Sequence, residues 1–89
     1  MIKKKIKIIN KLGLHARASS KLTQLSSKFS SKIFIIKDEK KVDAKSIMDI
    51  LMLAASQGTE IELLTDGPDE LIATNEIELL FKTYFGEGE

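Results

Sequence analysis

The spacing of apolar residues switches repeatedly between two periods along the chain, and this switching limits the possible folds more than any other feature. Segments with the alternating or β-branched patterns of strands lie at 2–8, 32–37, 41–43 and 59–65. Segments with apolar residues at helical spacing lie at 16–29, 47–55 and 68–84. The order βαββαβα predicts an α+β fold, in which a four-stranded antiparallel sheet carries three helices on one face.

Length and composition narrow the class of protein further. At 89 residues we expect one domain, 1–89, with one small core, and without cysteine its stability must come from packing instead of disulfides or thiolate metal sites. The basic N-terminal segment lacks a signal peptide's apolar run, and no later segment could span a bilayer, so we expect a soluble cytoplasmic protein without membrane insertion. The 14 basic and 13 acidic residues argue against wholesale nucleic-acid binding.

The same patterns assign individual residues to the core and to the ends of helices. The positions expected to face the core are Ile2, Ile6, Ile8, Ala18, Leu22, Leu25, Phe29, Ile50, Leu53, Ala54, Ile61, Leu63, Ala73, Ile77, Leu80 and Tyr84. Gly58 is expected to be the left-handed cap of the second helix, and Pro68 the first residue of the last helix. Residues 86–89 are expected to form a frayed tail.

The only histidine and the only arginine stand two residues apart, where the first helix is predicted to begin. The first turn of a helix has N–H groups without intrahelical partners and carries partial positive charge, so it attracts anions. Because Leu14, His15 and Ala16 are not usual capping residues, we expect the N–H groups near Arg17 and Ala18 to stay free for a phosphate. A guanidinium can bind phosphate bidentately and a neutral imidazole can act as a nucleophile. The pattern therefore predicts a phosphohistidine site, although a lone histidine beside a glycine is often only a loop residue or a cap.

A second candidate region begins at Ser46-Ile47-Met48-Asp49, which matches a capping box: Ser46 should cap the helix and Asp49 should reach back to the Ser46 N–H. The helix that follows is apolar nearly all round. If one side faces the sheet, Ile47, Met48 and Leu51 remain partly exposed and could form a docking surface. The alternative is that all three are core residues of a helix covered on both sides.

Two further residues could contribute to docking. Ser20 and Gln24 lie one turn apart on the first helix, on a face that a partner docking over His15 could touch.

The segment Gly13-Leu14-His15-Ala16-Arg17, followed some thirty residues later by Lys45-Ser46-Ile47-Met48, resembles the HPr family. These are the histidine-containing phosphocarriers of the bacterial phosphoenolpyruvate-dependent sugar phosphotransferase system. The resemblance covers the whole chain and implies the family's open-faced β-sandwich.

The resemblance also implies roles for individual residues. His15 would accept a phosphoryl group on Nδ1 from phosphorylated enzyme I and pass it to the IIA component of a sugar permease, while Arg17 would neutralise the phosphate. Ser46 would be a regulatory serine, modified by a kinase/phosphorylase in bacteria that have one, and the helix after it would supply apolar contacts to partners. Such a protein is a phosphotransfer intermediate, not a self-contained catalyst. We expect it to be a monomer without cofactor or metal.

Two positions depart from the family pattern. The family commonly has proline where this chain has Ala18, and a small polar residue where it has Leu12. Neither position supplies the reacting group, but both could affect the transfer rate. They leave open a regulatory role in which phosphorylation signals nitrogen or carbon status. A more distant alternative is a small RNA-binding module that uses the lysine-rich first strand, for which Phe34 is the only candidate stacking aromatic among the strands.

Overall fold

The computed structural model describes residues 1–86 of the chain. Within them the elements follow the predicted order: β1 (Ile2–Lys7), α1 (Ala16–Ser26), β2 (Lys32–Lys37), β3 (Lys40–Asp43), α2 (Ile47–Met52), β4 (Glu60–Asp66), α3 (Glu70–Lys82) and a 3₁₀ turn (Tyr84–Gly86). None of the helices in this range is long and apolar enough to cross a membrane.

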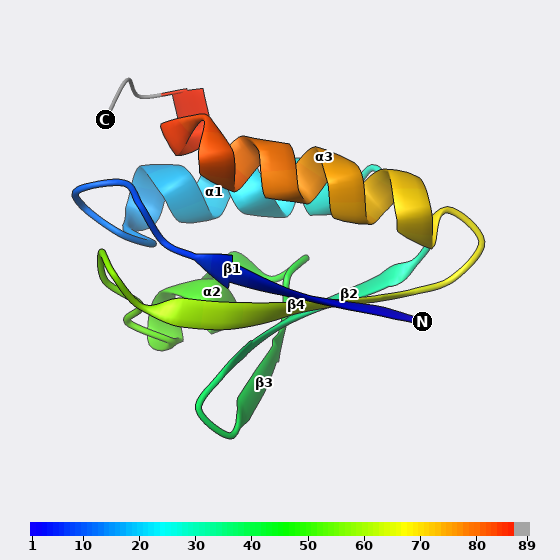
Figure 1. Cartoon of the computed structure of the whole chain (residues 1–89), viewed down its shortest axis with the longest axis horizontal. Helices are drawn as coiled ribbons and strands as arrows, with labels where there is room; N and C mark the ends of the chain where they lie inside the picture. Colours follow the sequence, from blue (N-terminus) through cyan, green and yellow to red (C-terminus); the bar gives the residue numbers. More distant parts are fainter. Residues whose placement is uncertain (87–89) are drawn as a thin grey trace.

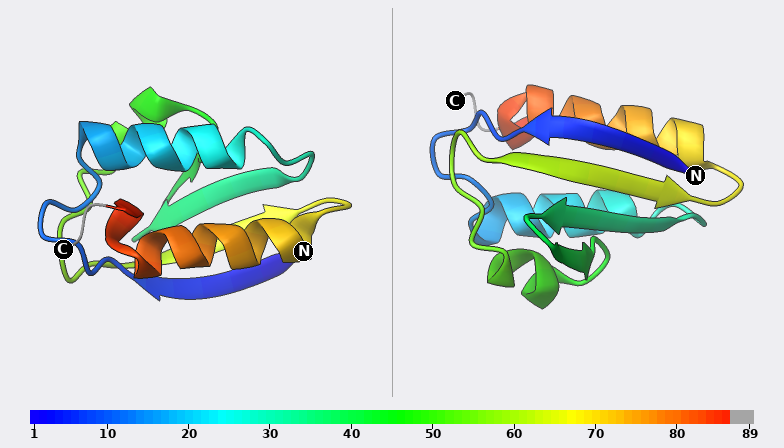
Figure 2. Two further views of the ribbon diagram at one scale, coloured as in Figure 1. Left: turned by 90° about the horizontal axis from the view of Figure 1, so that it is seen from above. Right: turned by 60° about the horizontal axis from the view of Figure 1, so that its bottom comes forward.

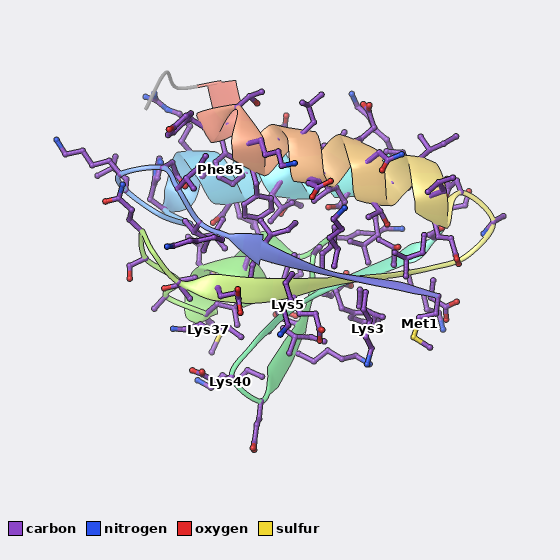
Figure 3. All side chains as sticks on the ribbon, viewed as in Figure 1. Met1, Lys3, Lys5, Lys37, Lys40 and Phe85 are labelled. Atoms are coloured by element: carbon purple, nitrogen blue, oxygen red, sulfur yellow. The ribbon has the colours of Figure 1, made fainter. Side chains whose placement is uncertain are left out.

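The four strands form one antiparallel sheet in the order β1-β4-β2-β3. Helices α1 and α3 run antiparallel to each other over one face of this sheet, and α2 packs beside α1 next to β3 (Figures 1 and 2). The other face is open, and Figure 3 shows Lys3 and Lys5 on that side, away from α1 and α3. The predicted open-faced α+β sandwich is confirmed.

One core fills the space between the sheet and the helices. The strands contribute mainly isoleucine and leucine, because every second side chain of a strand faces the helical layer. The fully buried side chains include Ile8, Ile33, Ile35, Ile61, Leu63, Ala18, Leu22, Ile50, Ala73, Ile77 and Phe81. Most of the predicted core positions are thus confirmed, with Ile2, Leu25, Phe29 and Leu80 only partly buried.

Two helices end earlier than predicted. Helix α1 stops at Ser26, so Phe29 packs against the core from the segment beyond it. Helix α2 stops at Met52, and the residue that turns the chain is Ala54, with φ of 50°. Ala54 is therefore exposed, contrary to the prediction, and Ala55 is buried in its place. Gly58 does have a left-handed φ of 89°, but it lies in the turn before β4 and does not cap α2.

The ends of α3 also differ from the prediction. Pro68 precedes the helix, whose N-cap position is held by Asp69. Tyr84 lies beyond the helix with φ of 57°, and this turn places Phe85 in the core. The rings of Phe81 and Phe85 meet edge to face at 4.8 Å between centroids. Phe85 is therefore a core residue, whereas Tyr84, predicted to face the core, is only partly buried. Of the predicted tail, residues 87–89 lie outside the described part of the chain.

Three lysine ammonium groups bind backbone carbonyls just after the helices. Lys45 Nζ donates to the carbonyl of Phe29 after α1 at 2.8 Å, Lys37 Nζ to Leu53 after α2 at 2.9 Å, and Lys21 Nζ to Phe85 after α3 at 2.6 Å. Each bond ties the segment that follows a helix to another element or loop: Lys45 lies before α2, Lys37 ends β2 and Lys21 lies on α1.

Candidate functional site

His15 occupies the N-cap position of α1, with extended backbone angles (φ −78°, ψ −178°). Its carbonyl accepts the first helical hydrogen bond, from the N–H of Ser19 at 2.8 Å. Its ring nitrogen Nδ1 accepts a second one, from the N–H of Arg17 at 3.3 Å. The prediction that the Arg17 N–H stays free was therefore wrong, because the histidine ring itself caps the helix. An imidazole that accepts through Nδ1 carries its proton on Nε2 when neutral.

The surroundings of the ring favour an anion. The first turn of α1 contains no acidic side chain. Ala16 and Arg17 are exposed, and His15 is half-buried, so the start of α1 is open to solvent. The helix N-terminus supplies partial positive charge there, and Arg17 adds a full positive charge on the same helical turn.

The loop that leads to His15 is bonded to the segment that follows α2. The N–H of Leu14 donates to the carbonyl of Ala55 at 2.9 Å, and the N–H of Gly58 donates to the carbonyl of Ile8 at 2.7 Å. Gly13 lies so close to this segment that a Cβ on it would be 2.4 Å from the Ala55 carbonyl oxygen. The close approach and a φ of 65° both require glycine at this position.

Ser46 caps α2 as predicted, with its Oγ accepting the N–H of Asp49 at 3.4 Å. The second half of the capping box is not formed. The N–H of Ser46 donates to the carbonyl of Asp43 at 3.1 Å, because residues 43–46 form a turn of their own. Asp49 does not reach back to it, contrary to the prediction.

The outer surface of α2 is apolar and exposed. The exposed fraction is 37% for Ile47, 63% for Met48 and 73% for Met52, and Leu51 is half-buried, whereas Ile50 is fully buried. The helix is therefore covered on one side only, as the docking interpretation requires. Met52 was not predicted to belong to this surface, although it stands four residues after Met48 on the same side of the helix. Their role in docking remains a prediction.

The two polar residues expected on a face that a partner docking over His15 could touch also have defined positions. Ser20 is half-buried and Gln24 exposed on α1, which packs against α2. The Gln24 amide Nε2 donates to Ser20 Oγ at 3.3 Å. The two side chains thus form one polar contact on α1, in the same helical layer as the exposed side of α2.

A surface groove lies outside the predicted phosphate site. The groove, of about 340 Å³, lies between β3 and α2, lined by Lys40, Lys41, Val42, Asp49, Met52 and Leu53. None of the residues predicted for the phosphate site lines it. Within residues 1–86, no group of three histidine, cysteine, aspartate or glutamate side chains could hold a metal ion.

The lysine-rich first strand does not form a purely basic surface. Lys5 and Lys7 stand directly opposite Glu62 and Glu60 of β4, so two of the lysines on this strand have a carboxylate as their cross-strand neighbour. The ring of Phe34 lies under the ammonium of Lys41, at 4.5 Å from the ring centroid. This arrangement gives no support to the RNA-binding alternative.

A sequence model described as "PTS HPr component phosphorylation site" matches residues 2–83. The chain belongs to the HPr family of phosphocarrier proteins. It is 55% identical to phosphocarrier protein HPr of Neisseria meningitidis, with the whole of both chains aligned. A crystal structure of HPr from Thermoanaerobacter tengcongensis is 47% identical, with a TM-score of 0.95 over 98% of each chain. A structure described as an HPr dimer from the same organism has a TM-score of 0.79 and 47% identity, over 98% of this chain and all of that one.

Family membership makes phosphotransfer within the phosphotransferase system the general function of this chain. The sequence resemblance to HPr is thereby confirmed. The roles assigned to His15, Arg17, Ser46 and the docking residues are not tested by these similarities and remain predictions.

Proposed function

We propose that His15 accepts a phosphoryl group on Nδ1 from phosphorylated enzyme I and delivers it to IIA components of sugar permeases. The observation that carries this proposal is the contact between Nδ1 and the N–H of Arg17 at the start of α1. It directs the Nδ1 lone pair toward the positive end of a helix. A group bound to that nitrogen would lie within reach of the helix N–H groups.

The transfer itself needs little from the protein except position and charge. The Nδ1 lone pair forms a bond to phosphorus while the bond between phosphorus and the donor nitrogen breaks, and that electron pair returns to the donor. As the Nδ1 lone pair enters the new bond, it can no longer accept the Arg17 N–H. The N–H is then available to a phosphoryl oxygen, and the Arg17 guanidinium can bind the other oxygens. Transfer to a IIA component is the same step in reverse.

The direct test is incubation with enzyme I and phosphoenolpyruvate. The wild-type chain should take up one acid-labile phosphate, and His15→Ala should take up none while keeping its circular dichroism spectrum. Acid-labile phosphate on His15→Ala would show that another residue is the acceptor.

Docking is proposed to use the exposed side of α2 together with the adjacent part of α1. Ile47, Met48 and Leu51, with Met52 added from their shared exposure, would supply the apolar contact. Ser20 and Gln24 would supply polar contacts at its border. A flexible, methionine-rich apolar surface suits a carrier that must bind several partners, because methionine adapts its shape to different surfaces.

Ser46 is proposed as a regulatory phosphorylation site in an organism that has the corresponding kinase/phosphorylase. Its hydroxyl caps α2, and a phosphate at a helix N-terminus stabilises the helix. Inhibition would arise from the new charge beside Ile47 and Met48, which would have to be desolvated on docking. Ser46→Asp should therefore slow phosphorylation of His15 without lowering the melting temperature, and equal rates for both proteins would remove Ser46 from the docking surface.

We further propose a cytoplasmic monomer as the working form, since enzyme I must reach His15 and α2 together. The relative described as an HPr dimer makes the oligomeric state a quantity to measure. The purely regulatory role remains the alternative, because the exposed Leu12, at 69%, offers no polar group to the phosphate. Rapid transfer from the phosphorylated chain to a sugar-permease IIA component would favour transport over signalling.

A further inference from the structure

Two buried polar side chains hold the two peptide carbonyls that immediately precede His15. The amide Nδ2 of Asn10 donates to the carbonyl of Gly13 at 2.8 Å. The hydroxyl of Ser19 donates to the carbonyl of Leu14 at 3.1 Å. Asn10 is 1% exposed and Ser19 is fully buried, so both carbonyls point toward the interior.

Asn10 ties the loop in two ways. Besides the side-chain bond, its backbone carbonyl accepts the N–H of Gly13 at 3.1 Å, which closes residues 10–13 into a turn. The side-chain oxygen Oδ1 is buried and has no hydrogen-bond partner within residues 1–86. Within residues 1–86, the amide Nδ2 is thus the side-chain atom through which Asn10 is bonded to the loop.

Ser19 joins the loop to the helix. Its N–H donates to the carbonyl of His15 as the first helical hydrogen bond, while its hydroxyl binds the carbonyl one residue earlier. The single residue Ser19 therefore binds the carbonyls of the two peptide units on either side of His15. Asn10 also binds the Gly13 carbonyl, and the Leu14 N–H donates to the Ala55 carbonyl. The backbone from the Gly13 carbonyl to the Leu14 carbonyl is therefore hydrogen-bonded at each polar group.

We propose that Asn10 and Ser19 are positioning residues for His15. They hold the Gly13 and Leu14 carbonyls away from the phosphoryl site and so fix the imidazole at the N-cap of α1. This inference rests on the proposed function of His15. Carbonyl oxygens carry partial negative charge and would repel a phosphoryl group, whereas the N–H groups of the first helical turn attract it. Small displacements of a reacting group can slow a reaction about a hundredfold, so the effect of these residues should appear in the rate of transfer.

The test compares Asn10→Ala and Ser19→Ala with two matched controls. Ser26→Ala removes another buried serine hydroxyl from α1, one that has no hydrogen-bond partner within residues 1–86. Asn75→Ala removes an exposed asparagine from α3. Ser19→Ala keeps a good helix former in α1, so it remains informative if Asn10→Ala fails to fold.

The first readout is phosphorylation of His15 by enzyme I. Asn10→Ala and Ser19→Ala should each lower kcat at least about tenfold with little change in KM, because docking surfaces are untouched, and the controls should match wild type. Equal kcat values for folded Ser19→Ala and Ser26→Ala would overturn the proposal for Ser19, and wild-type kcat in folded Asn10→Ala would overturn it for Asn10.

The second readout is the NMR signals of the His15 ring nitrogens and the Arg17 amide in the unphosphorylated protein. The two variants should shift these signals toward those of an uncapped histidine, and the controls should not. This readout is independent of enzyme I, so it separates failure of the positioning role from failure of the proposed function. If wild type takes up no phosphate but the ring signals still shift, the proposed function fails and the positioning of the ring stands. Unchanged ring signals in both variants would overturn the positioning role.

Discussion

The imidazole of His15 accepts the Arg17 N–H through Nδ1, the same nitrogen that we propose as the phosphoryl acceptor. The ring therefore occupies, in the unphosphorylated chain, the position that a phosphoryl oxygen would take afterwards. Because one N–H is passed from the ring to the phosphate, neither state leaves this helical donor unsatisfied. Arg17 is exposed on the first turn, and its guanidinium would contribute only after His15 is phosphorylated, by binding the phosphoryl oxygens.

Arg17→Lys keeps the charge but removes the planar fork of donors. We expect transfer from the phosphorylated chain to a IIA component to slow by about ten- to a hundredfold, the range expected when a charge-assisted hydrogen bond is lost. The melting temperature should change little, because the side chain is exposed. Stopped-flow transfer measurements decide the question: unchanged rates would mean that the helix N-terminus binds the phosphate without the guanidinium.

The sequence indicated His15 and Arg17 because each is unique and both stand where a helical pattern begins. It did not indicate that His15 caps the helix with its own ring, since histidine is not a usual capping residue. Asn10 and Ser19 were also missed. A buried polar residue in a loop or on a helix has no periodic signature, and its hydrogen-bond partner is known only when the backbone is placed.

The proposed regulatory and docking functions lie next to each other, with Ser46 at the N-cap and the docking residues in the six-residue helix α2. Its start was predictable, because Ser46 and the three residues after it form a capping sequence. Its end was not predictable, because Ala54 takes a left-handed conformation, which costs a residue other than glycine about 1–2 kcal/mol. The bonds from Lys37 to Leu53 and from Leu14 to Ala55 hold this turn, and both depend on distant parts of the chain.

Met48→Glu should weaken binding to enzyme I by about 1–2 kcal/mol, the range for an interface residue of some importance. Met48 is 63% exposed, so the melting temperature should stay nearly constant. Leu71→Glu is the matched control, because Leu71 is 64% exposed on α3, outside the proposed surface. The substitution likewise replaces an exposed apolar side chain with a carboxylate. Calorimetric titration with enzyme I measures both variants, and equal affinities for the two would exclude Met48 from docking.

Over the whole molecule, the fold was the most predictable property, because four strand patterns and three helix patterns in a fixed order leave few ways to build one core. Hydrogen bonds between segments far apart in the sequence were less predictable. The Asp69 carboxylate makes three such bonds. It accepts the Ser31 hydroxyl, the Ser30 N–H at 2.8 Å and the Ser31 N–H at 2.9 Å. The start of α3 is thereby tied to the segment before β2.

These bonds make stability depend on pH. The Ser31 hydroxyl and the Ser30 N–H lower the pKa of Asp69, and the Gly67 N–H lowers the pKa of Glu70. A carboxyl group with a lower pKa in the folded state stabilises the fold above its unfolded pKa, about 4, and this stabilisation is lost as the pH falls through the folded value. The melting temperature should therefore be steady near neutral pH and fall below about pH 4.

Asp69→Asn tests this link. It should lower the melting temperature at pH 7. The difference from wild type should shrink in acid, where the wild-type carboxyl group is protonated and, like the asparagine amide, carries no charge. Glu76→Gln, at an exposed position of α3, serves as the control for loss of one carboxylate. If the difference in melting temperature between Asp69→Asn and wild type stays constant from neutral to acid pH, then ionisation of Asp69 does not cause the pH dependence of stability.

NMR of the chain phosphorylated by enzyme I can show which ring nitrogen of His15 carries the phosphoryl group. Long-range proton–nitrogen spectra distinguish phosphorylation at Nδ1 from phosphorylation at Nε2, and the amide spectrum reports the hydrogen bond of Arg17 in both states. We predict the phosphoryl group on Nδ1 of His15 and an Arg17 amide that remains hydrogen-bonded, with its signal shifted by the new acceptor. A phosphoryl group on Nε2, or an Arg17 amide unaffected by phosphorylation, would show that Nδ1 and the Arg17 N–H do not form the phosphate site.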